Sequence, residues 1–79
     1  MVTIHREHGI HVVIFTDDHI PAHVHVFGDG EAKIDLQGPN DVPTLVWAVG
    51  MTRAEVRKAM LIVTGNREQL LARWRAIDG

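Results

Sequence analysis

Residues 23–36 decide the fold of this chain, and they read His23-Val24-His25-Val26-Phe27-Gly28-Asp29-Gly30-Glu31-Ala32-Lys33-Ile34-Asp35-Leu36. Apolar and other residues alternate in residues 23–27, so the two valines share one face of a strand and the two histidines share the other. Residues 31–36 alternate again, with apolar side chains at every second position. The glycine-rich segment 28–30 supplies the tight reversal between them. The pattern predicts an antiparallel hairpin with one apolar face and one face that carries histidines.

The segments on either side of this hairpin indicate more strands. Residues 10–15 are rich in β-branched and aromatic side chains and predict a strand, either paired with residues 2–5 or continuous with them. Residues 37–43 contain glycine and two prolines and predict a loop. Residues 44–49 are compatible with a last strand, although their nearly continuous apolarity does not fix the type of element. The first half of the chain is therefore expected to be a β-meander of three to four strands.

Two helices are predicted in the C-terminal third. Thr52 and Glu55 have the spacing of a capping box, in which each side chain satisfies a free amide at the start of a helix. A buried stripe follows at the i, i+3, i+4, i+7 spacing, and Gly65 is placed to end the helix in a left-handed cap. In a second helix Leu70, Trp74 and Ile77 lie on one face, as core residues do. The predicted fold class is α+β: one domain spanning residues 1–79, with a small antiparallel β-meander followed by two C-terminal helices.

Composition limits the function classes. Seventy-nine residues support one core, and no apolar run approaches the roughly 20 residues needed to span a bilayer, so no membrane association is expected. The chain has no cysteine, which excludes disulfides and a cysteine nucleophile and favours a cytoplasmic location. Residues 51–79 carry more basic than acidic side chains, and among them Arg53, Arg57 and Lys58 are candidates for binding nucleic acid or an acidic partner. Solvated helix faces produce the same excess without any partner.

The most function-like feature is a histidine cluster, formed by Asp18, His19, His23 and His25. A histidine has an unperturbed pKa of about 6.5, so such a cluster can act as general acid and general base in catalysis. Two imidazoles on one strand face can also converge on a divalent metal, with His19 or Asp18 as third ligand to His23 and His25. In a third interpretation His23 and His25 are strand residues satisfied by backbone carbonyls or by carboxylates such as Asp35. The sequence leaves these alternatives open.

The string Asp18-His19-Ile20-Pro21-Ala22-His23-Val24-His25-Val26 resembles a bacterial family known as domain of unknown function 4160. The likeness continues outside it, in Thr3-Ile4, in Gly9-Ile10 with the following strand, and in the Leu70-Leu71-x-x-Trp74 pattern. Ala22 departs from the family, which often has a second proline at that position.

The resemblance implies a toxin component of a bacterial type II toxin–antitoxin pair that binds a small antitoxin protein and acts on RNA or on another cellular target. Carboxylates beside the histidines would repel a phosphate backbone unless a metal neutralised them, which favours metal-assisted over metal-free catalysis. The alternative is a non-enzymatic interaction or regulatory module that forms homo- or hetero-oligomers. In that case Val46, Trp47 and Val49 would belong to an interface, and the histidines would be structural or metal-binding.

Overall fold

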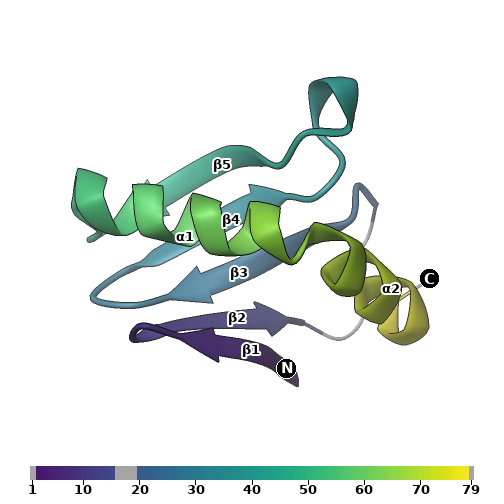
Figure 1. The fold of residues 1–79 in the computed structure, drawn as a ribbon, viewed down its shortest axis with the longest axis horizontal. Helices are drawn as coiled ribbons and strands as arrows, with labels where there is room; N and C mark the ends of the chain where they lie inside the picture. Colours follow the sequence, from purple (N-terminus) through teal and green to yellow (C-terminus); the bar gives the residue numbers. More distant parts are fainter. Residues whose placement is uncertain (1, 16–19, 79) are drawn as a thin grey trace.

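The computed structural model describes residues 2–15 and 20–78 and shows one antiparallel sheet with both helices on the same face (Figure 1). The strands follow one another in chain order, β1-β2-β3-β4-β5. Their bounds are Val2–Glu7, Ile10–Ile14, His23–Phe27, Glu31–Asp35 and Thr44–Val49. A short 3-10 turn, η1 (Pro39–Asp41), precedes β5, and the helices α1 (Arg53–Gly65) and α2 (Arg67–Ile77) close the chain. The α+β class, the antiparallel meander and the two C-terminal helices are confirmed.

The number of strands was underestimated, because the sheet has five strands rather than three to four. The sequence left open whether residues 2–5 pair with residues 10–15 or continue into them, and the structure shows that they pair, in a register that runs from Val2 opposite Ile14 to Glu7 opposite Ile10. The turn between the two strands consists of His8 and Gly9, with φ of 51° and 79°. Positive φ at both central residues is what a tight two-residue hairpin turn requires, but glycine is usually its only signal in a sequence.

The hairpin of residues 23–36 forms with the predicted faces. His25 lies opposite Lys33, and Val24 lies opposite Ile34. The turn packs closely against the far end of β5, since a Cβ atom added to Gly30 would overlap the backbone of Val49 and Gly50. Only glycine fits at this point, so the turn also positions the end of the edge strand.

The core lies between one face of the sheet and the helices. From the sheet it contains the alternate apolar residues, and from the helices it contains the predicted stripe; its fully or nearly fully buried members include Val12, Val24, Val26, Ile34, Val63, Leu70 and Trp74. The interpretation of Trp74 as a core residue is thus confirmed. Burying such side chains is worth about 1.5–3 kcal/mol each before the cost of ordering the chain.

Side-chain hydrogen bonds tie the helices to the sheet. The capping box predicted at Thr52 and Glu55 is present, and Glu55 also accepts a hydrogen bond of 3.0 Å from the Asp29 backbone N–H. Arg67 Nε, at the start of α2, donates to the Leu36 carbonyl oxygen at 2.9 Å. Each helix therefore begins at a contact with the β3–β4 hairpin. These contacts hold both helices on one face of the sheet, and neither helix covers the other face. Among the described residues, no helix is long and apolar enough to cross a membrane.

Candidate functional site

His23 and His25 lie on β3, on the face of the sheet opposite the helices. Both are buried, with 6% and 9% of their surface exposed, yet neither belongs to the core beneath the helices. Their ring centroids are 5.5 Å apart in an edge-to-face arrangement. The structure therefore brings these two predicted residues together, inside a second, smaller packed region.

Aromatic side chains from neighbouring strands enclose His25. The Phe15 ring centroid is 4.2 Å from that of His25, and the Trp47 centroid is 5.9 Å from it. Phe27 extends the group, 6.5 Å from Phe15. We call Phe15, His23, His25, Phe27 and Trp47 the histidine–aromatic cluster. Trp47 connects this cluster to β5, the last strand of the sheet.

Hydrogen bonds fix the orientation of both imidazoles. His23 Nδ1 donates to the Pro21 carbonyl oxygen at 2.9 Å, and His25 Nδ1 lies 3.1 Å from Glu31 Oε2. Since a carbonyl or carboxylate oxygen only accepts, Nδ1 carries the proton in each ring. A strand histidine held by a carbonyl and one held by a carboxylate match the structural interpretation, with Glu31 in the place expected for Asp35.

The remaining members of the predicted catalytic and metal site, Asp18 and His19, lie outside the described residues. Within the described ranges 2–15 and 20–78, no group of three or more His, Asp or Glu side chains is arranged to hold a metal ion. The metal hypothesis thus stays a prediction that rests on two described ligands, His23 and His25.

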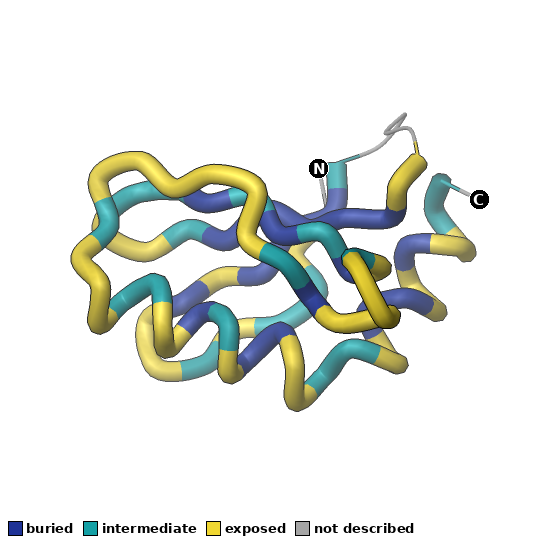
Figure 2. The backbone as a smooth tube through the Cα atoms, turned by 90° about the horizontal axis from the view of Figure 1, so that it is seen from above, coloured by how far each residue is buried: buried dark blue, intermediate teal, exposed yellow. Residues whose placement is uncertain are grey.

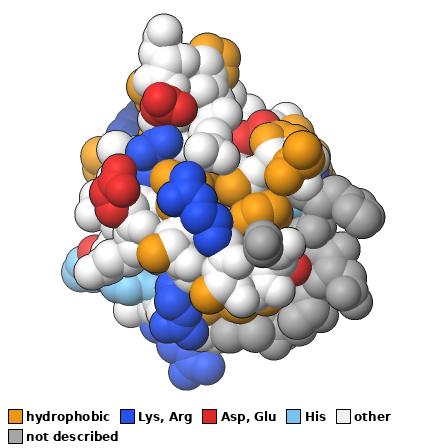
Figure 3. Space-filling view, turned by 90° about the vertical axis from the view of Figure 1, so that its right-hand side faces the viewer, with side chains coloured by type: hydrophobic (Ala, Val, Ile, Leu, Met, Phe, Trp, Pro, Cys, Tyr) orange, Lys and Arg blue, Asp and Glu red, His pale blue; other side chains and the backbone are white. Residues whose placement is uncertain are grey.

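The basic residues proposed for nucleic-acid or partner binding lie elsewhere. Arg53, Arg57 and Lys58 are exposed on α1, so the sheet separates them from the histidine–aromatic cluster. Lys58 Nζ donates to the His8 carbonyl oxygen at 3.3 Å and links α1 to the β1–β2 turn. On the end of the molecule that carries α2, hydrophobic and acidic side chains interrupt the Lys and Arg side chains (Figure 3). The described residues on that face form no continuous basic surface.

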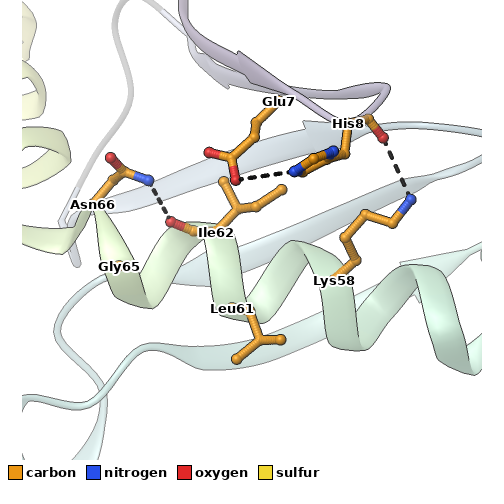
Figure 4. Close-up of a pocket in the computed structure, with 7 residues that line it drawn as sticks. All are labelled: Glu7, His8, Lys58, Leu61, Ile62, Gly65 and Asn66. Carbon is orange, nitrogen blue, oxygen red and sulfur yellow. Dashed lines mark hydrogen bonds and ion pairs between the residues drawn. The ribbon is translucent and has the colours of Figure 1, made fainter.

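A pocket of about 250 Å³ lies between the β1–β2 turn and α1 (Figure 4). Its polar groups already contact protein groups. Glu7 lies 2.8 Å from His5 and 3.7 Å from His8, and Asn66 Nδ2 donates to the Ile62 carbonyl oxygen at 2.8 Å. With its polar groups satisfied in this way, the pocket resembles a junction between turn and helix more than a ligand site.

The edge strand β5 carries a run of exposed apolar side chains. Leu45, Val46, Trp47 and Val49 are 38%, 47%, 38% and 68% exposed. Figure 2 shows the strand as one long exposed segment after η1. Its outer edge has no strand beside it among the described residues. The sequence analysis expected Val46, Trp47 and Val49 to be in excess of what the core can bury, and their exposure agrees with this.

Three neighbours of the histidines were missed by the sequence analysis, namely Phe15, Glu31 and Lys33. The alternation in residues 23–36 already places Glu31 and Lys33 on the same face as His25, so the register of the hairpin could have identified them. Phe15 follows the end of β2, and no spacing rule in the sequence predicts its contact with His25.

The fold and these surfaces define a small α+β domain with one helix-covered face and one exposed apolar edge. The model of the family described as domain of unknown function (DUF4160) matches residues 9–75, and the chain belongs to this family. Searches of curated proteins and of solved structures found no match.

Proposed function

We propose that this protein is a protein-binding module, the toxin-like member of a toxin–antitoxin pair, and that its small antitoxin-like partner adds a strand to β5. The observation that carries the proposal is the edge itself: among the described residues no strand pairs with the outer side of β5, and four of its apolar side chains are exposed. Partner chains commonly bind sheet edges in this way, because backbone hydrogen bonds give affinity and side-chain contacts give specificity. The toxin–antitoxin setting comes from the family resemblance.

The burial of the histidines supports binding over catalysis. At 6% and 9% exposure, His23 and His25 offer little ring surface to a macromolecular substrate. Trp47 is different, because the same side chain contacts His25 and remains 38% exposed on β5. A packed histidine–aromatic cluster of this kind would hold the edge strand in a fixed position for its partner.

The test is a titration of the protein with the small companion protein that the family resemblance implies. We expect Val46→Lys/Val49→Lys to weaken binding at least tenfold by isothermal titration calorimetry, which is about 1.4 kcal/mol. Leu61→Lys is the matched control, since Leu61 on α1 is an apolar side chain that is 69% exposed. Equal affinities for the two variants would refute the proposal.

A second candidate function is supported by the contact between His25 and Glu31. A carboxylate 3.1 Å from Nδ1 orients an imidazole as in many acid–base and metal sites, and Lys33 lies opposite His25 on the next strand. Under this candidate the protein acts on RNA through His23 and His25, with the contributions of Asp18 and His19 expected from the sequence and a divalent metal as cofactor.

Growth inhibition separates the two candidates. If the histidines are catalytic, His23→Gln and His25→Gln should abolish growth inhibition in bacteria and leave companion binding unchanged. Circular dichroism melting would identify variants that merely fail to fold. Growth inhibition that survives both substitutions would exclude the catalytic candidate.

A further inference from the structure

The composition of β5 is unusual for an exposed edge. Its residues, Thr44–Val49, include no charged side chain and no proline. Natural sheets usually protect their edges with charges, prolines, bulges or a covering segment. Within the part of the chain that the structure describes, the only such device at β5 is a bulge at Val46, which leaves both faces of the strand apolar. An edge of this kind is therefore a ready template for pairing with another strand.

The register of β5 on β4 shows which strand fits. Lys33 lies opposite Trp47 and Ile34 opposite Leu45, so Val46 is the extra residue. Leu45 and Ala48 consequently share the helix-side face, opposite Ile34 and Ala32. Thr44 and Val49 share the other face, because their partners Asp35 and Glu31 alternate with Ile34 and Ala32 along β4.

This arrangement makes β5 complementary to itself. Antiparallel pairing around a two-fold axis between Val46 and Trp47 places Leu45 opposite Ala48 of a second copy, and Thr44 opposite Val49. Residues that face each other across an antiparallel pair must project to the same side of the sheet, and both pairs do. Shifting the register by one residue would place Leu45 opposite Trp47 or Val49, which lie on the other face. No like charges meet in the matched register, since β5 carries none.

We propose that β5 pairs with β5 of a second copy in this register, forming a continuous ten-stranded sheet across a two-fold axis. The proposal concerns the same edge as the proposed function and adds its regulation: self-pairing covers the edge until the partner displaces it. A single pair of six-residue strands is a small contact, and interfaces below about 1,200 Å² are typically weak and transient. The dimer is therefore reversible and accessible to exchange.

Cysteine cross-linking tests the register directly, because the natural chain contains no cysteine. A mixture of Leu45→Cys and Ala48→Cys chains should form a disulfide-linked heterodimer under mild oxidation. Either variant alone should link poorly, because identical positions are offset by three residues, about 10 Å along the strand, and a disulfide needs Cα atoms within about 7 Å. Leu61→Cys mixed with Ala48→Cys is the control for random collision. Equal cross-linking in the control would overturn the proposal.

Sedimentation equilibrium gives an independent readout on the unmodified chain. The weight-average mass should rise with concentration from 8.8 kDa toward twice that value, and Val46→Lys/Val49→Lys should stay at 8.8 kDa. A wild-type protein that remains monomeric at millimolar concentration would overturn self-pairing. That failure is distinct from failure of the proposed function, because a monomer would still bind the companion through β5 if only self-pairing is wrong.

Discussion

The two edge strands of the sheet, β1 and β5, lie at opposite ends of the same rows of paired residues. The side chains at the two ends differ in character. One row runs from Thr3 on β1 through Val13, His25 and Lys33 to Trp47 on β5. The next runs from Arg6 through His11, Phe27 and Glu31 to Val49. At β1 the rows end in a hydroxyl and a guanidinium, and at β5 they end in an indole and an isopropyl group. A charged edge resists pairing with another strand, so the difference assigns partner binding to β5.

The largest stability effect should come from the ends of the first row. Trp47→Ala should lower the free energy of unfolding by about 1–2 kcal/mol, because it removes the edge-to-face contact with His25 and partly buried indole surface. Thr3→Ala, at the exposed opposite end, should change it by less than about 0.5 kcal/mol. Urea denaturation measures both. Similar losses for the two variants would mean that Trp47 contributes no packing to the cluster.

A smaller effect is expected at Glu31, where the second row passes beside His25. Glu31→Gln keeps an acceptor but removes the carboxylate, and its side chain is 37% exposed. We expect a loss of less than about 1 kcal/mol in the free energy of unfolding, because water screens the contact on its exposed side. Asp35→Gln is the matched control on the same strand face. A loss above 3 kcal/mol at Glu31 would show a buried charge network instead of a local hydrogen bond.

The smallest predicted effect is a change in self-association when a β1 residue is replaced by its counterpart from β5. Arg6→Val removes the exposed charge at the end of the second row and should raise self-association only severalfold, since the Glu7 carboxylate, 2.8 Å from His5 Nε2, remains on that strand. Val49→Arg, the reciprocal change, should reduce self-association by a similar or larger factor. Sedimentation velocity compares them. Stronger association in Val49→Arg than in the wild type would contradict the assignment of the edges.

Much of the fold could be predicted from local patterns. Alternation in residues 23–36 gave the hairpin and both of its faces, and the Thr52–Glu55 spacing gave the start of α1, because both patterns depend on neighbours in sequence. Gly65 ends α1 without the left-handed conformation that its position suggested; Asn66 follows as the cap. The sequence did not decide whether residues 2–5 pair with residues 10–15 or continue into them, because the β1–β2 turn depends on His8 adopting positive φ, which a non-glycine residue seldom does.

The candidate site was less predictable, for a physical reason. The apolar run Thr44–Val49 has the composition of a buried strand, and only the order of the strands shows that it lies at an edge. In the same way, His25 binds Glu31 rather than Asp35 because the side chain reaches diagonally across the hairpin, a choice that the alternation alone does not make. The exposure of β5 therefore depends on the order of all five strands, and the partner of His25 depends on how its side chain is oriented within the hairpin.

The most direct test of the edge assignment is an amide chemical-shift titration of the isotope-labelled protein with its small companion, followed by nuclear magnetic resonance. The account predicts that shifts concentrate in Thr44–Val49 and their neighbours on β4, while Val2–Glu7 and the exposed face of α1 remain unchanged. Shifts concentrated in β1, or around Arg53, Arg57 and Lys58 with β5 unaffected, would contradict it.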